Sequence, residues 1–251
     1  MAMTPYPGGN DDYENPSIVV SDDGTTWAVP DGLTNPIDAF PGGSSFNADT
    51  EIIIGQDNKI YCFYMDSDGS TQNRALVRSS IDGVTWDAEV ELFVTARKGF
   101  CSPAVIWDGS QYIMWYVDAS VSPYKLYRRT CTTLSETWSA AEQCIASIPV
   151  GYGKDLWHPD VTLDSGIYYM FMAICNAGTN GVGTILWLYR STDGLTWTPY
   201  NAYLLKPSVG GWDNGKIYRA SAVKTESGFD LWYSAENTSG VWKTGRTTVI
   251  L

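Results

Sequence analysis

The sequence predicts an all-β fold, a β-propeller, and three observations support this prediction. The phrase Ser-x-Asp-Gly-x-Thr-Trp occurs three times, ending at Trp27, Trp86 and Trp197, and a degenerate copy ends at Trp138. These tryptophans lie about 50 to 60 residues apart, a period typical of repeat proteins such as propellers. Aromatic residues are abundant, with 11 Trp, 16 Tyr and 7 Phe, whereas only 18% of residues are charged. Such a composition, with 24 glycines available for turns, is typical of an all-β domain.

Each copy of the phrase predicts a hairpin. In an Asp-Gly pair the Asp side chain caps its own backbone, and Gly accepts a positive φ. The Thr and Trp that follow suit the start of the next strand, with the indole packed between neighbouring repeats. Because turn chemistry explains these aspartates, we interpret them as hairpin formers and not as catalytic groups.

The second repeat defines the unit, and the later repeats follow it. Its four strands are predicted at 46–54, 60–65, 74–80 and 90–93, which is the content of one propeller blade. Corresponding strands are predicted at 102–107, 112–116 and 125–129, at 158–163, 168–172 and 186–191, and at 218–223, 229–234 and 242–247.

The first repeat is incomplete, because Met1–Thr4 aligns with Met170–Ala173 in the second strand of the fourth repeat. We predict a single domain with five blade positions and an incomplete first blade, since the fifth repeat already has three strands of its own. The blades are predicted at about 1–43, 44–97, 98–150, 151–210 and 211–251. The chain is then a fragment or begins at an internal methionine. The alternative is a four-bladed ring that the N-terminal strands close by completing the last blade.

Charge and hydropathy exclude several classes of partner. The net charge is −12, with 16 Lys+Arg against 28 Asp+Glu, so nucleic acid and anionic membranes are not expected partners. No apolar run approaches the ~20 residues of a membrane span. The segment Met1–Pro5 shows no signal peptide, which leaves an extracellular or virion-associated location open, and the oligomeric state is not set.

The cysteines give no support for a zinc or redox motif. Their number, five, is odd, and no Cys-x-x-Cys occurs. Most fall in strand-like apolar runs, so we expect buried free thiols, with a disulfide left open. The residues are Cys62, Cys101, Cys131, Cys144 and Cys175.

The repeats, the x-Pro-x-Val segments at Pro103 and Pro159 and the Asp-Gly hairpins together resemble the five-bladed propeller glycosidases of glycoside hydrolase families 43, 32 and 68. The hairpin is also similar to the Asp-box of sialidases, which has one more residue between Asp and Gly. The resemblance covers essentially the whole chain as a blade pattern. In those enzymes, acidic residues on the innermost strands of different blades converge on the axis, because glycoside cleavage needs an acid and a base or nucleophile.

The resemblance implies Asp49 and Asp160 as catalytic carboxyl groups. Ser102 stands where the family often has Asp, and the first blade lacks the inner strand that carries the family's base. If Asp49 and Asp160 align as in family 43, inversion of configuration is expected. Both could instead bind sugar hydroxyls, backbone or a cation.

The expected substrate-binding residues begin the inner strands or flank them: His158, Arg219, Trp157, Tyr218 and Trp212. His158 is interpreted as a ligand of sugar hydroxyls or a proton shuttle, or else as a structural histidine. Arg219 is expected to clamp a glycan or to pair with Asp160. The aromatic rings are expected to stack on sugar or to pack.

Two further acidic residues are weaker candidates. Asp155 lies on the loop before the fourth inner strand. Glu14 stands where the other repeats have apolar or small residues, and we interpret it as a solvent-exposed strand end.

These observations predict a carbohydrate-active propeller, similar to glycoside hydrolases, that binds a glycan or polysaccharide in the axial funnel and hydrolyses a glycosidic bond. The alternative is a non-catalytic glycan-binding or structural module, for example of a phage tail or surface assembly. No cofactor is expected, and one histidine excludes a multi-histidine metal site. A structural calcium held by carboxylates and carbonyls stays open.

Overall fold

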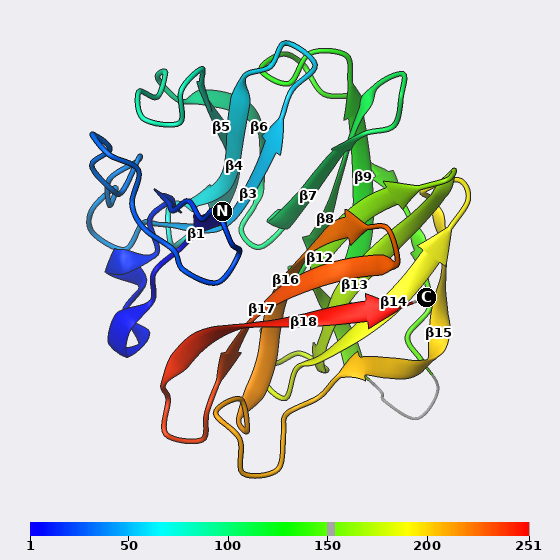
Figure 1. Cartoon of the computed structure of the whole chain (residues 1–251). Coiled ribbons are helices and arrows are strands. Elements are labelled where there is room, and N and C mark those ends of the chain that lie inside the picture. The colour runs from blue at the N-terminus through cyan, green and yellow to red at the C-terminus, as the bar shows by residue number, and fades with distance from the viewer. Residues whose placement is uncertain (150–153, 251) are drawn as a thin grey trace. The chain divides into compact units, whose positions relative to one another are not determined.

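The chain is an all-β protein, and the computed structural model describes residues 1–149 and 154–250 (Figure 1). Within those residues no α-helix occurs, and the helical turns are the 3-10 helices η1 (Pro7–Gly9) and η2 (Asp11–Tyr13). The described strands form four sheets of three to five strands and one two-stranded sheet. None of the described helices is long and apolar enough to span a membrane. The predicted blade boundary at 150/151 lies outside the described residues.

Two compact units make up the chain. The first contains Met1–Met114 and Arg129–Ala140, and the second contains Trp115–Arg128 and Ala141–Leu251. The division therefore passes through the third repeat.

The second repeat forms a four-stranded antiparallel sheet, and all four predicted strands are confirmed. Its order is β3 (Phe46–Ile54), β4 (Ile60–Ser67), β5 (Gln72–Ser80) and β6 (Val90–Ala96). Every residue of β4 after Ile60 is buried, which explains why this strand is a continuous apolar run in the sequence. The outermost strand, β6, has no buried residue.

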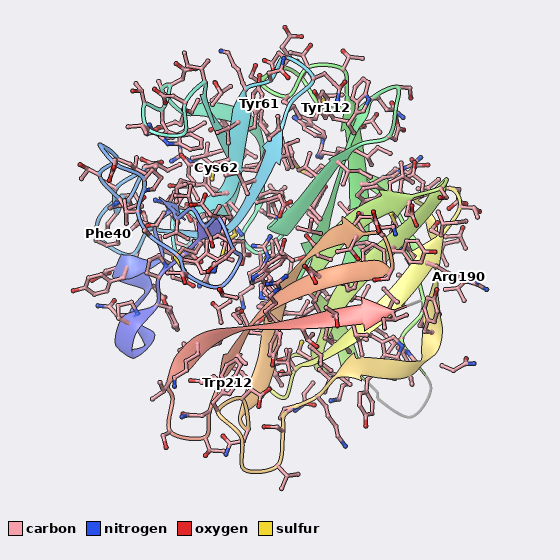
Figure 2. The ribbon with its side chains drawn as sticks, viewed as in Figure 1. Phe40, Tyr61, Cys62, Tyr112, Arg190 and Trp212 are labelled. Atoms are coloured by element: carbon pink, nitrogen blue, oxygen red, sulfur yellow. The ribbon has the colours of Figure 1, made fainter. Side chains whose placement is uncertain are left out.

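Tyrosine hydroxyls fix the turn between β3 and β4. Tyr61 donates its hydroxyl proton to Asp57 at 2.7 Å, and the hydroxyl of Tyr112 accepts the N–H of Gln56 at 2.6 Å; both tyrosines are labelled in Figure 2. Asn58 in this turn has a φ of 63°.

The third and fourth repeats also form sheets at the predicted positions. The third has the order β10-β9-β8-β7, with β7 (Cys101–Trp107), β8 (Tyr112–Asp118), β9 (Lys125–Cys131) and β10 (Glu142–Gln143). The fourth has the order β11-β15-β14-β13-β12, with β11 (Ile145–Ala146), β12 (Lys154–Asp164), β13 (Ile167–Asn176), β14 (Ile185–Ser191) and β15 (Thr196–Leu205). Its strands are antiparallel except for β11, which runs parallel to β15.

The fifth repeat is a three-stranded meander of β16 (Lys216–Thr225), β17 (Gly228–Glu236) and β18 (Trp242–Ile250), drawn in orange to red in Figure 1. The first repeat forms its own sheet, in which β1 (Ala2–Met3) pairs with β2 (Ser17–Ile18). Four sheets of three or more strands are thus present among the described residues, the number in the four-bladed alternative. The two-stranded sheet occupies the residues of the predicted incomplete first blade, and within the described strands it pairs with none of the others.

The Asp-Gly phrases form the predicted turns. In the second copy, Asp82 accepts the N–H groups of Val84 and Thr85, both at 2.8 Å, while the Ser80 hydroxyl accepts the N–H of Gly83 at 2.8 Å. The same bonds recur around Asp23 and Asp193. The glycines have φ values of 68°, 76° and 67°, in a region that Gly populates without steric cost. Turn formation therefore accounts for these aspartates.

Aromatic packing between repeats is confirmed within each unit. In the first unit, Trp138 meets Phe63 edge-on with ring centroids 6.3 Å apart. In the second unit, Trp197 meets Trp115 at 5.8 Å. The five cysteines are buried and free, as expected.

Candidate functional site

The inner strands of three repeats are irregular where the predicted site residues lie. The register shifts between Ala48 and Glu51 in β3, between Leu156 and His158 in β12, and between Ile217 and Ala220 in β16. Bulges re-aim side chains and occur often beside active sites. The residues inside these irregularities include Asp49, Trp157, Tyr218 and Arg219.

Asp49 lies at the bulge of β3 in the first unit. Its φ of 58° is left-handed, a conformation that costs a non-glycine residue energy and persists where surrounding contacts fix it. One such contact involves the carboxylate itself, whose Oδ2 accepts the N–H of Ser102 on β7 at 3.0 Å. The side chain is therefore oriented by the next repeat, at the position where the resemblance implies a catalytic carboxyl group.

Glu14 is a second acidic residue of this region. Burial and the neighbouring charges of Asp49 and Asp11 raise the pKa of Glu14 to about 8. Its carboxyl group is therefore largely protonated at neutral pH. The interpretation of Glu14 as a solvent-exposed strand end is wrong, because the side chain is half-buried beside β3.

Hydrogen bonds between asparagines hold the Glu14 segment. Asn15, the next residue, accepts a bond from the buried Asn47 of β3 at 3.1 Å and donates to the carbonyl of Asp12 at 2.7 Å. Together with Asp49 and Ser102, these residues form what we call the carboxyl pair site. Its carboxyl groups are those of Glu14, a weaker candidate in the sequence, and Asp49.

Asp160 occupies a comparable place in the second unit. Its Oδ2 accepts the N–H of Ala222 on β16 at 2.9 Å, just as Asp49 accepts from β7. Burial raises the pKa of Asp160, while the Ala222 N–H and the charge of Arg219 oppose this rise. The charge of Arg219 thus favours the ionised form of Asp160. The Arg219 side chain is half-buried.

His158 is buried between two aromatic rings. Its ring centroid lies 4.9 Å from that of Trp157 and 4.5 Å from that of Tyr218, and the residue is 1% exposed. Tyr218 in turn meets Trp242 at 5.2 Å. Trp242 was not predicted as part of this group, because it comes from the last strand, 24 residues after Tyr218.

A loop packs on the rings of Trp157 and Tyr218, and the side chain of Lys216 lies at the edge of this aromatic group. A Cβ on Gly181 would lie 2.9 Å from Trp157 Nε1 and 3.0 Å from Tyr218, so this loop packs directly on both rings. Lys216 Nζ lies 4.7 Å from the centroid of Trp242 and 5.5 Å from that of Tyr218. Tyr218 and Trp242 are the half-buried members that could meet a sugar.

Two other candidates make structural contacts. Trp212, labelled in Figure 2, stacks on Tyr233 with centroids 5.7 Å apart and packs on a core cluster that the fourth and fifth repeats share. Asp155 accepts hydrogen bonds from Ser122, Tyr124 and Gly178. Asp155 thus joins two loops of the second unit, and these three hydrogen bonds satisfy a carboxylate that is only 1% exposed.

The predicted site residues are divided between the units. Asp49 belongs to the first unit, whereas Asp160, His158, Trp157, Tyr218, Arg219 and Trp212 belong to the second. In the described part of the chain, no three His, Cys, Asp or Glu side chains are grouped so that they could hold a metal ion.

The four sheets of three to five strands, with carboxyl groups oriented on their first strands, are the blades of a β-propeller fold. No protein-family model matches the chain. The A type blood N-acetyl-α-D-galactosamine deacetylase of Flavonifractor plautii is 27% identical over 276 residues, covering 89% of this chain and 36% of that protein. The chain thus spans about a third of the length of that relative.

Solved structures agree on the fold. The crystal structure of an N-acetylgalactosamine deacetylase from F. plautii, in complex with blood group B trisaccharide, matches with a TM-score of 0.88 and 22% identity over 98% of this chain and 83% of that chain. A thermostable family-43 glycoside hydrolase matches with a TM-score of 0.69 and 15% identity over 82% of this chain and 72% of the other. The predicted resemblance to propeller glycosidases is confirmed for the fold.

Proposed function

We propose that this chain is a carbohydrate-active hydrolase that binds a glycan containing an N-acetylated amino sugar and removes the acetyl group. The observation that carries the proposal is the carboxyl pair: Glu14, protonated near neutral pH, beside the charge of Asp49. Two carboxyl groups that interact electrostatically can divide the roles of acid and base.

Amide hydrolysis needs both roles. Water adds to the acetyl carbon, losing a proton to a base, and the C–N bond breaks as the amine nitrogen takes a proton from an acid. Acetate and the free amino sugar leave. In this proposal Asp49 accepts the proton from water and Glu14 donates one to nitrogen.

The similarity to the F. plautii deacetylase, over 89% of this chain, supports an acetamido sugar as the substrate. The crystal structure of an F. plautii N-acetylgalactosamine deacetylase contains blood group B trisaccharide, which supports a glycan as the partner.

Hydrolysis of a glycosidic bond is the second candidate. The observation that favours it is Asp160, whose pKa is raised by burial on an inner strand, as a general acid for glycoside cleavage requires. In that case Asp160 acts as the acid, and Trp157, Tyr218, His158 and Arg219 of the same unit contact the sugar.

A single substrate separates these functions. The protein would be incubated with p-nitrophenyl N-acetyl-α-D-galactosaminide, and both acetate and p-nitrophenol would be measured. Acetate release, lost in Glu14→Gln and Asp49→Asn but retained in the exposed control Glu226→Gln, is the expected result. Release of p-nitrophenol alone would favour the glycosidase. Glycan binding on an array without either product would indicate a non-catalytic glycan-binding module.

A further inference from the structure

Asn47 is a buried amide that ties the Glu14 segment to β3. Asn47 is 1% exposed, and its Nδ2 donates both to Asn15 Oδ1 and to the carbonyl of Ala39, each at 3.1 Å. Asn15 is 6% exposed and lies 32 residues earlier in the chain. Asn47 therefore connects three separate stretches of the first unit.

Local hydrogen bonds hold the turn before Asn15. Asn10 Oδ1 accepts the N–H of Asp12 at 3.0 Å, and the Glu14 N–H donates to the carbonyl of Asp11 at 3.0 Å. The Asn15 amide donates to the Asp12 carbonyl, so the turn and the Asn15 side chain form one unit. The Asn47 side chain, on β3, donates a hydrogen bond to Asn15 and so ties this turn to the sheet.

We propose that Asn47 is a positioning residue that holds Glu14 beside Asp49 through its hydrogen bond to Asn15. Asn47 and Asp49 lie two residues apart on β3, and Glu14 and Asn15 are adjacent. The bond between the asparagines therefore fixes the separation of the two carboxyl groups. This inference rests on the proposed function for its catalytic consequence, but not for its electrostatic one.

The electrostatic consequence can be measured on Glu14 directly. The charged groups that raise its pKa are Asp49, from β3, and Asp11, from η2. Asp11 belongs to the same turn as Glu14 and moves with it, whereas Asp49 does not. Release of the Asn15–Asn47 bond should weaken the effect of Asp49 and admit water to Glu14, and both changes lower its pKa.

Asn73 provides a matched control. This asparagine of β5 is 2% exposed, and its Nδ2 donates to a distant carbonyl, that of Phe100, at 3.0 Å. The same amide donates to the sulfur of Met65, so its described bonds lie away from the Glu14 segment. A substitution there removes a buried amide of the same kind without touching the turn.

The experiment is an NMR titration of the Glu14 side-chain carboxyl in full-length protein labelled with ¹³C-glutamate, assigned with Glu14→Gln. We expect Asn47→Ala to lower the pKa of Glu14 by about one pH unit or more, and Asn73→Ala to leave it unchanged. We also expect the acetate-release kcat/KM of Asn47→Ala to fall about 10- to 100-fold, with its pH profile displaced toward lower pH. Asn15→Ala should reproduce both effects and serves as the second variant if Asn47→Ala does not fold.

An unchanged Glu14 pKa in folded Asn47→Ala and Asn15→Ala would overturn the inference. Equal displacement in Asn73→Ala would also overturn it, because the effect would then be general loosening. A wild-type protein with a raised Glu14 pKa but no acetate release would contradict the proposed function and leave the positioning role standing.

Discussion

Replacement of Glu14 by Gln should remove a pH dependence from the stability of the protein. The pKa of Glu14 is about 8 in the folded chain, against an ordinary value of 4.5. Between these values the folded state keeps a proton that the unfolded state has lost, so the free energy of unfolding falls as pH rises. The contribution of Glu14 is complete below about pH 4.5 and is lost by about pH 8.

The magnitude follows from the size of the pKa difference. Each pH unit in this window costs at most about 1.4 kcal/mol, so the whole span is bounded by about 5 kcal/mol. Because Glu14 is only half-buried and solvent screens its charge, we expect about 2 to 3 kcal/mol. Glutamine resembles the protonated acid in shape, so Glu14→Gln should match the wild type near pH 5 and exceed it by this amount near pH 8.5.

The assay is urea unfolding followed by tryptophan fluorescence at pH values from 5 to 8.5. The difference between variant and wild type is the relevant quantity, because Asp160 and other groups contribute equally to both curves. The exposed Glu226→Gln should leave the pH dependence unaltered. Parallel curves for the wild type and Glu14→Gln would refute the assignment of a buried, protonated Glu14.

Three other substitutions test particular contacts and the choice between the two candidate functions. Asp193→Ala removes the acceptor for the Leu195 and Thr196 N–H groups and should lower the free energy of unfolding by about 1 to 2 kcal/mol in chemical unfolding. A decrease of less than about 0.5 kcal/mol would contradict this role of Asp193. Gly181→Ala places a Cβ 2.9 Å from Trp157 at a residue with a φ of 92°. It should lower the free energy of unfolding by about 2 kcal/mol or more and change the near-UV circular dichroism of the tryptophans. Gly178→Ala, which has open space around its Cβ, should change that signal less. Asp160→Asn should abolish p-nitrophenol release if the glycosidase candidate is right, and should leave acetate release within a few-fold of the wild type if the deacetylase is right; kinetics on the two products decide.

Local features of the fold were predictable from the sequence. The hairpins at Asp23, Asp82 and Asp193 depend on residues within five positions of each other, and the strand β3 follows the predicted segment 46–54 from end to end. The interpretation of Asp49 as an oriented inner-strand carboxyl came from a resemblance, and its bond to Ser102 agrees with the expected contact between carboxylate and backbone. Its catalytic role remains a proposal.

The sequence by itself therefore determined the repeat, its strands and its turns, because hydrogen bonding in turns and the alternation of strands act over a few residues. Tertiary structure decided which side chains share an environment. Glu14 became a partner of Asp49 only through folding, and Trp242 joined Tyr218 only through the pairing of the last sheet. Burial and the field of a neighbouring charge act through space, so no local pattern in the sequence records them.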